Sequence, residues 1–243
     1  PEGFIERNGN VRFYRNWKMQ KGWVAHNDTK YYLDGAGNLV RGWFTDATGT
    51  YYLSPQDGSI ARGQCNIDGA DHYFTADGVK TSGWVVLGDL KYFYDPANNG
   101  AMKREWLSDE KGNFYYFDAN DGHMLTGVQV IGGKNYLFSP EGIRVTGMNA
   151  REDGCYYYDP ATGEMVTGWF MAADKTYYAD AAGHIVTGIY EIDGQPYYFD
   201  ETGVLIRNQD LELNGKAYHA TPEGVLTEVE AAQAGEGEAA AQE

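Results

Sequence analysis

The side chains in this sequence that are best suited to chemistry are aromatic rings that recur at a regular spacing. Five of them are tryptophans that each follow a glycine or, in one case, a glutamate: Trp23, Trp43, Trp84, Trp106 and Trp169. Flat rings stack on the apolar faces of sugars while neighbouring polar groups bind the hydroxyls. Rings arranged as a cage hold a quaternary ammonium ion through the ring quadrupole, at about 0.5–2 kcal/mol per contact. The tryptophans therefore favour a binding site for a carbohydrate or an organic cation.

A second aromatic position accompanies the tryptophans. It holds Tyr32, Tyr52, Tyr73, Phe93, Tyr116, Tyr157, Tyr178, Tyr198 and Tyr218, with Leu137 as the aliphatic exception. A position that only fills a core would accept leucine or valine more often, so we interpret this ring as a ligand contact. The tryptophan position is less regular, and elsewhere it holds Gln64, Val128, Met148, Ile189 and Gln209. The apolar replacements leave packing in a partly buried position as the alternative role of each tryptophan.

Groups for catalysis or metal binding do not form a recognisable pattern. Many aspartates lie in turns, as Asp34, Asp77 and Asp200 do, where their carboxylates bond to the local backbone. The five histidines share no ligand spacing, and we interpret them as turn or surface residues. The sequence contains no G-x-S-x-G, H-E-x-x-H or phosphate-loop motif. We therefore predict no catalytic residue, no metal and no cofactor, with a carboxylate pair for glycoside hydrolysis as the open enzymatic alternative.

Net charge, hydropathy and cysteine content exclude several classes of partner and of site. The formal charge is -16 at pH 7 and no Lys/Arg-rich cluster offsets it, so nucleic-acid binding is not expected. No run of about 18 apolar residues occurs, so no membrane span is predicted. Cys65 and Cys155 fall four repeats apart, which should exceed the roughly 7 Å Cα limit for a disulfide. We expect two free thiols and no metal site.

The elements that must position these rings repeat along the chain. Aligned on the first clear copy, the repeats begin 20 to 22 residues apart, at Gly22, Gly42, Gly63, Gly83, Glu105, Gly127, Gly147, Gly168, Gly188 and Asn208. An imperfect half repeat with Phe13, Tyr14 and Trp17 precedes them. Repeat length varies mostly in one turn, from DGAG at Asp34 to DPANNG at Asp95, which marks that turn as facing solvent.

Each repeat is predicted to be a β-hairpin followed by a link to the next hairpin. Its first strand carries the tryptophan and its second strand carries the tyrosine pair. Asp-Gly or Asn-Gly pairs begin at Asp68, Asp153, Asp193 and Asn214, and they signal a hairpin because both central residues need positive φ. One hairpin cannot bury its aromatic face alone. We therefore predict an all-β solenoid of about ten stacked β-hairpin repeats of 20–22 residues.

Three segments follow from the repeat boundaries. Residues 1–21 are expected to be a partial N-terminal repeat, residues 22–227 the solenoid, and residues 228–243 an acidic low-complexity tail or linker. In the last repeat Gln209 is assigned to the tryptophan position, and Ala217 and Tyr218 to the aromatic pair. Such an atypical copy is expected at the end of an array.

The repeated unit resembles the cell-wall-binding repeats of Gram-positive surface proteins. The segments that carry the resemblance include GWFTDATGTYYLSPQDGSIARG, which starts at Gly42, and GIYEIDGQPYYFDETGVLIRN, which starts at Gly188. The match covers about residues 9–227. That superfamily includes the choline-binding modules of wall hydrolases, the glucan-binding repeats of glucosyltransferases and the carbohydrate-binding regions of clostridial toxins. The resemblance implies a β-hairpin superhelix outside the cell, with ligands held between successive hairpins.

The choline-binding branch usually carries a second tryptophan just before the tyrosine pair. That tryptophan, the Gly-Trp ring and an aromatic residue of the following hairpin form its cage. Here the position holds Lys30, Thr50, Asp71, Lys91, Asn135, Cys155, Thr176, Pro196 and Lys216. A lysine ammonium would repel choline, so the resemblance favours the glucan or wall-carbohydrate branch. The exception is a cage-like set at Met102, Trp106, Phe114 and Tyr116.

We predict a non-catalytic, secreted or cell-surface module that attaches a larger protein to cell-wall or extracellular polysaccharide. Choline binding, and a structural spacer or adhesion stalk without a ligand of its own, are the alternatives. Because the sequence begins with Pro1 rather than Met, we expect a piece of a longer protein that carries a further domain. The expected ligand-binding residues are Trp23, Tyr32, Trp43, Tyr52, Trp84, Met102, Trp106, Phe114, Tyr116, Trp169 and Tyr178.

Overall fold

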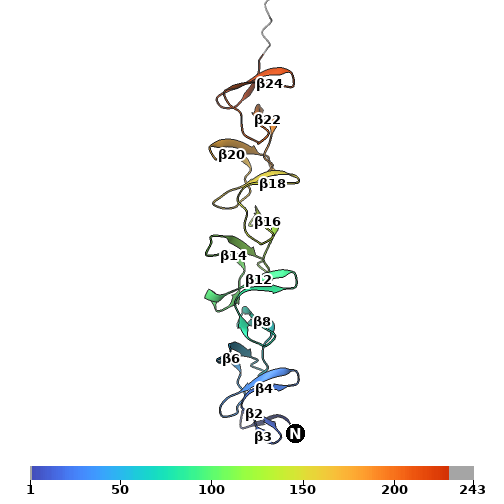
Figure 1. Cartoon of the computed structure of the whole chain (residues 1–243), viewed down its shortest axis with the longest axis vertical. Coiled ribbons are helices and arrows are strands. Elements are labelled where there is room, and N and C mark those ends of the chain that lie inside the picture. Colours follow the sequence, from blue (N-terminus) through green and yellow to red (C-terminus); the bar gives the residue numbers. More distant parts are fainter. Residues whose placement is uncertain (1, 230–243) are drawn as a thin grey trace, which may run out of the picture. The chain divides into compact units, whose positions relative to one another are not determined.

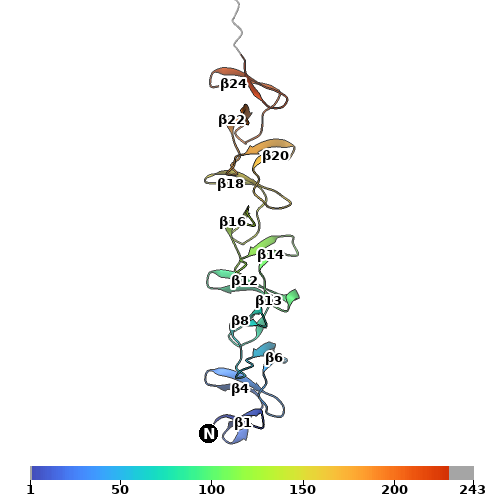
Figure 2. The ribbon, with the colours of Figure 1, turned by 180° about the vertical axis from the view of Figure 1, so that it is seen from behind.

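The structure is a computed structural model that describes residues 2–229. Its contacts divide the chain into two compact units, Pro1–Leu125 and Thr126–Glu243. Within each unit, successive hairpins follow one another and point in different directions (Figure 1), as the view from behind also shows (Figure 2). Apart from one 3-10 turn, η1 (Pro96–Asn98), every regular element in residues 2–229 is a β-strand. None of the described helical structure is long and apolar enough to span a membrane.

In its described residues, the first unit forms six sheets, each built on an antiparallel hairpin. The N-terminal sheet contains β1 (Glu2–Arg7), β2 (Asn10–Arg15) and β3 (Lys18–Met19). The next three sheets contain β4 (Gly22–His26) and β5 (Thr29–Leu33), β6 (Gly42–Thr45) and β7 (Thr50–Leu53), and β8 (Gly63–Ile67), β9 (Ala70–Phe74) and β10 (Lys80–Thr81). The last two sheets contain β11 (Gly83–Leu87), β12 (Leu90–Asp95) and β13 (Ala101–Met102), and β14 (Glu105–Ser108) and β15 (Phe114–Phe117).

The second unit forms five such sheets in its described residues. The first four contain β16 (Gly127–Ile131) and β17 (Lys134–Phe138), β18 (Gly147–Arg151) and β19 (Gly154–Tyr158), β20 (Gly168–Ala172) and β21 (Lys175–Ala179), and β22 (Gly188–Ile192) and β23 (Gln195–Phe199). The last contains β24 (Gln209–Leu213), β25 (Lys216–Ala220) and β26 (Leu226–Glu228). Nine of the ten predicted repeat starts, from Gly22 to Gly188, are the first residue of a strand. The predicted all-β fold of stacked hairpins is confirmed.

Most hairpin turns have the backbone that their sequences predict. Asp193 and Gly194 both have positive φ, 52° and 76°, as the mirror-image two-residue turn of a twisted hairpin requires. The hairpin β18–β19 is the exception, because Arg151 pairs with Gly154 and the two loop residues are Glu152 and Asp153. The predicted Asp-Gly turn is therefore shifted by one residue in this hairpin.

Burial along most second strands alternates with a period of two, as side chains of a strand do. In β7, Tyr51 and Leu53 are buried while Tyr52 between them is half-buried. The same alternation holds in β21, where Tyr177 and Ala179 are buried and Tyr178 is not. The first tyrosine thus packs into the core in these hairpins, and the second lies at its edge.

In many repeats a backbone hydrogen bond joins the link to the preceding hairpin. We call the residue two positions after the second-turn glycine the link residue of its hairpin. The link residue Ile60 donates its N–H to the carbonyl of Lys30 in the preceding hairpin at 3.0 Å, and in the second unit Ile185 donates to Cys155 at 2.8 Å. These bonds satisfy backbone groups that the two-stranded hairpins leave open, and they fix how one hairpin sits on the next.

The second-turn glycines pack directly on the link residue of the preceding hairpin. A Cβ added at Gly58 would meet the side chain of Leu39, and one at Gly203 would meet that of Ile185. Both glycines also have positive φ, 76° and 83°, which side chains with a Cβ rarely adopt. Glycine is therefore required here by the backbone and by the close approach of two hairpins.

The two ends of the array depart from expectation in part. Residues 2–19, expected to be a partial repeat, form the complete three-stranded sheet β1–β2–β3. In the last hairpin the assignment of Gln209 to the tryptophan position is wrong, because Asp210 pairs with His219 there. Tyr218 pairs with Leu211 and takes the place of a first tyrosine. One extra residue between Asn208 and the turn causes the shift. Of the predicted tail, residues 230–243 lie outside the described residues.

Replacement of Gly203 by alanine should destabilise the second unit more than replacement of Gly188. Gly188 has a φ of 74° but nothing within 4 Å of its added Cβ, so G188A should cost only the left-handed strain of about 1–2 kcal/mol. G203A adds a clash with the Ile185 side chain, which is buried. Thermal unfolding of the two variants measures the difference, and equal losses of Tm would contradict the stacking contact.

Aromatic grooves between successive hairpins

The tryptophan of each hairpin lies opposite the second aromatic residue of the same hairpin. The register pairs Trp43 with Tyr52, Trp84 with Phe93 and Trp169 with Tyr178. Their ring centroids are 5.1–5.2 Å apart in edge-to-face arrangements. Such cross-strand pairs stabilise the hairpin and fix the direction of the tryptophan ring. These residues of the predicted site are therefore brought together.

The following hairpin contributes a third ring to Trp43, Trp84 and Trp169. Trp84 meets Tyr115 and Trp169 meets Tyr197, each at 5.2 or 5.1 Å between centroids. At Trp43 the corresponding ring is His72, at 5.2 Å. A fourth ring lies two residues further along the same strand, at 5.7–6.1 Å: Phe74, Phe117 and Phe199. Each of these three tryptophans thus lies in a groove between two successive hairpins, with a wall from each.

The tryptophan position lies at the surface of the hairpin in most repeats, although Trp23 and Trp106 are half-buried. Trp43, Trp84 and Trp169 are 39%, 47% and 43% exposed. Val128 and Ile189, which had favoured a partly buried packing position, are 47% and 46% exposed. About half of each of these side chains is covered, so the position is partly buried, as the apolar replacements indicated. An exposed apolar side chain that recurs in this way marks an interaction surface.

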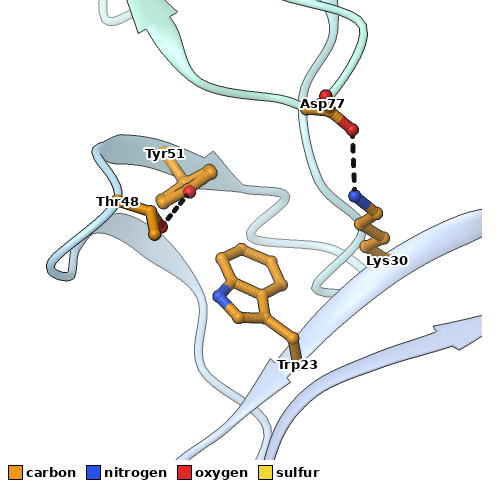
Figure 3. Close-up of a pocket in the computed structure, with 5 residues that line it drawn as sticks. All are labelled: Trp23, Lys30, Thr48, Tyr51 and Asp77. Carbon is orange, nitrogen blue, oxygen red and sulfur yellow. Dashed lines mark hydrogen bonds and ion pairs between the residues drawn. The ribbon is translucent and has the colours of Figure 1, made fainter.

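The groove around Trp23 is a pocket of about 300 Å³ lined by Trp23, Lys30, Thr48, Tyr51 and Asp77. Figure 3 shows the indole between two polar pairs that belong to three successive hairpins. On one side, the Tyr51 hydroxyl lies 2.7 Å from Thr48 Oγ1, and on the other, Lys30 Nζ lies 3.2 Å from Asp77 Oδ1. The pocket therefore combines an aromatic ring with donors and acceptors around its rim.

The carboxylate of Asp46 holds two side chains of this pocket in place through hydrogen bonds. Trp23 Nε1 donates to Asp46 Oδ2 at 2.9 Å, and Thr48 Oγ1 donates to Asp46 Oδ1. Since Thr48 has one hydroxyl proton, Tyr51 donates to Thr48 in turn. Hydrogen bonds from the Thr48 hydroxyl and from the Trp23 indole stabilise the carboxylate and lower the pKa of Asp46 to about 2.

The expected cage at Trp106 is assembled in part. Trp106 pairs with Tyr116, with ring centroids 5.0 Å apart. Phe114 lies two residues from Tyr116 on the same strand, opposite Ser108, and is 38% exposed. Met102 is the link residue of the preceding hairpin and packs with Val85, Tyr92 and Tyr94. The remaining expected residue, Tyr32, contacts Trp23 and lies 4.0 Å between centroids from Phe44 of the next hairpin.

Several groove residues were absent from the residues predicted to bind the ligand. The first tyrosines, such as Tyr51 and Tyr115, escaped notice because adjacent residues of a strand face opposite sides, so only the stacking brings them to a neighbour's tryptophan. His72 was expected in a turn or at the surface, and this is wrong: it is 4% exposed and its Nδ1 lies 3.0 Å from the Gly100 carbonyl. When the repeats are aligned, His72 occupies the position of the first tyrosine of the pair, and this was the signal in the sequence for its place in the core.

Groups with metal-ligand spacing occur once among the described residues. Ligand atoms of Asp118, Asp121 and His123 lie within 4.8 Å of one another. Asp118 already accepts the backbone N–H groups of its own turn, and Asp121 already bonds to His123 Nδ1. Cys65 and Cys155 are both free thiols. The two aspartates and His123 are thus already engaged by the local turn.

Models of known protein families match several of these repeats. Residues 61–106, 81–126 and 125–170 match the choline-binding repeat, and residues 21–39 match a putative cell wall binding repeat. The chain belongs to the cell-wall-binding repeat family. The matched segments contain Trp23, Trp84, Trp106 and Trp169.

Curated relatives match part of this chain with a small part of their own length. The chain is 34% identical over 148 residues to glucosyltransferase-S of Streptococcus mutans serotype c, and 33% over 114 residues to glucosyltransferase-I of Streptococcus downei. The alignments cover 58% and 46% of this chain but only 10% and 7% of those proteins. The chain thus spans at most about a tenth of their length.

Solved structures share the fold. CbpJ from Streptococcus pneumoniae TIGR4 superimposes with a TM-score of 0.68 at 22% identity, over 93% of this chain and 94% of that chain. Choline binding protein F from Streptococcus pneumoniae gives a TM-score of 0.64 at 23% identity, over 93% of both chains. At this level of identity the likeness establishes the hairpin-repeat fold.

Replacement of Asp46 by asparagine should remove the part of the acid-induced loss of fold stability that comes from this carboxylate. Because the folded-state pKa of Asp46 is about 2, below its usual value of about 3.9, its stabilising contribution is complete above about pH 4 and is lost as the pH falls towards 2. The difference in Tm between the wild type and D46N should therefore shrink between pH 4 and pH 2. Thermal unfolding across this range measures it, and a constant difference would contradict the role of the carboxylate.

Proposed function

We propose that this array is a non-catalytic module that attaches a larger secreted or surface protein to a cell-wall or extracellular polysaccharide. The observation that carries the proposal is the Trp23 pocket, with an aromatic ring at its centre and hydrogen-bonding groups at its rim. The membership of the chain in the cell-wall-binding repeat family supports the extracellular location. The glucosyltransferases that it resembles, in which the matched region is a small part of the whole, support attachment as the role.

The polar groups of the pocket suit the hydroxyls of a sugar. Lys30 and Asp77 are 41% and 83% exposed, and an ion pair at such a surface contributes only about 0–1 kcal/mol. Lys30 and Asp77 can therefore give up their ion pair and bond to sugar hydroxyls instead, at little cost in free energy. The Thr48 and Tyr51 hydroxyls offer further acceptors on the opposite wall. The Trp23 indole stacks on the apolar face of the sugar ring, and Asp46 holds it in place before the ligand arrives.

Repetition makes weak grooves effective. Each groove is shallow and buries only part of a sugar, so its own affinity is expected to be low. Several grooves on one chain that bind one polymer raise the total affinity by multivalency, without any new contact. A net charge of -16 keeps such an extended, aromatic-rich surface in solution and suits a neutral polymer.

Choline is the second candidate ligand. The specific observation in its favour is the set of rings around Trp84 and around Trp169, each with aromatic walls from two hairpins. The match of the chain to the choline-binding repeat supports the same ligand. Two further alternatives make opposite predictions: a ligand-free spacer predicts no retention on any polymer, and a cryptic glycoside hydrolase predicts turnover of the polymer.

Substitution of Trp23 by alanine should weaken retention on a polysaccharide while the fold stays intact. We expect a loss of roughly five- to tenfold in apparent affinity, equivalent to about 1–1.4 kcal/mol. Retention of the wild type and W23A is measured on immobilised dextran, on purified Gram-positive wall and on choline resin. Circular dichroism reports whether the hairpins are retained.

Val130 provides the matched control, because it is an apolar strand residue, 69% exposed, that lies outside the tryptophan position. V130A should bind as the wild type does. Equal retention of W23A and V130A would assign Trp23 to the core. Retention of the wild type on choline resin alone would favour the second candidate, absence of retention on all three would favour the spacer, and release of soluble sugar would favour the hydrolase.

A further inference from the structure

Three grooves of this chain have the same construction and differ at one position. The tryptophans are Trp43, Trp84 and Trp169, and each is surrounded by one ring of its own hairpin and two rings of the next. The link residue of the next hairpin is Lys80, Met124 and Leu205, respectively. Met124 and Leu205 are apolar and buried, at 7% and 6% exposure. Lys80 brings a charge to the same place.

The Lys80 ammonium lies over the face of the Trp43 ring. Its Nζ is 4.9 Å from the ring centroid, within the distance of about 6 Å at which a cation interacts with an aromatic ring. Nζ also donates to two oxygens of Asn99, Oδ1 at 2.7 Å and the backbone carbonyl at 3.0 Å. Three contacts therefore hold the ammonium in the groove. Burial lowers the pKa of the Lys80 amine, which agrees with a partly desolvated position.

The other two grooves contain no such cation. In the described part of the chain no lysine or arginine lies over the ring of Trp84 or Trp169, although the surrounding rings have the same spacing. The walls at Trp84 are Phe93, Tyr115 and Phe117. The chain thus provides its own comparison between an occupied and two open grooves.

We propose that Lys80 determines specificity at the Trp43 groove: it fills the groove with a cation of the chain and excludes a quaternary ammonium ligand, which the Trp84 and Trp169 grooves accept. This deepens the proposed function and rests on it, because it assigns different classes of ligand to separate grooves of one chain. The groove at Trp43 keeps a neutral ligand as its partner.

Charge explains the exclusion. A quaternary ammonium ion has no N–H and is held by the ring faces alone, so it needs the position that Lys80 Nζ already occupies. Two like charges on one ring repel, and displacement of Lys80 would break both hydrogen bonds to Asn99. A sugar hydroxyl meets neither obstacle. Lys80 has one N–H beyond those donated to Asn99, and this N–H can donate to the hydroxyl.

The test is the substitution Lys80→Met in the full chain, which places at Trp43 the residue type found at Met124. Choline is titrated into wild type and K80M by isothermal calorimetry, with tryptophan fluorescence as a second readout. We expect K80M to bind one more choline per chain than the wild type does. The double variant K80M/W43A should lose this added site, and K80R, which keeps a cation, should not gain it. Circular dichroism checks that each variant is folded.

The proposal is overturned if K80M gains no site, if the gained site survives W43A, or if W43A alone removes a choline site from the wild type. Retention of the same variants on dextran and purified wall is measured in parallel. Loss of all polymer retention with a gained choline site would reject polysaccharide attachment and leave the role of Lys80 standing. Normal polymer retention without a gained choline site would reject the role of Lys80 and leave polysaccharide attachment standing.

Discussion

The contact of a turn glycine with the link residue of the preceding hairpin is the constraint on which the rest of the structure depends. At Gly58 and Gly203 the backbone of one hairpin approaches the side chains of Leu39 and Ile185 so closely that no Cβ fits. Together with the link hydrogen bonds, such as that from Ile60 to Lys30, this contact fixes the step from one hairpin to the next. A fixed step places the first aromatic residue of the next hairpin at 4.7–5.2 Å between centroids from Trp23, Trp43, Trp84 and Trp169. The grooves are therefore a consequence of the stacking.

Because the stacking fixes the walls, the chemistry of each groove is decided by a few side chains that the stacking does not need. Trp23 has a polar rim formed by Lys30 and Asp77. Trp43 has the ammonium of Lys80 over its ring, whereas Trp84 has aromatic and apolar walls. One backbone pattern thus supports grooves of different polarity. Rings that are already in place lose little conformational entropy when a ligand binds, which benefits weak sites that act in series.

The repeat period predicted most of the fold, because turn glycines and the aromatic positions recur with little variation and each strand alternates with a period of two. Where a residue was added, as before the turn that follows Gln209, the sequence alone gave the wrong register. The candidate site was harder to predict. Trp43 and Tyr52 could be paired from one hairpin, but His72 and Lys80 reach the same groove only through contacts between hairpins. The exposure of Val128 and Ile189 also required the structure, since an apolar residue in a strand is equally compatible with a core.

The most direct test of the account is oxidative footprinting of the tryptophans in the presence and absence of a bound polysaccharide. Each tryptophan lies in a different peptide segment, so mass spectrometry reports its protection separately. Binding in the grooves predicts that the polymer slows oxidation of Trp23 and Trp43, whose grooves are assigned to a neutral ligand. Trp17, 80% exposed in the turn between β2 and β3, should oxidise at the same rate with and without polymer. Unchanged oxidation of all the groove tryptophans while the polymer is bound, or protection confined to Trp17, would contradict the account.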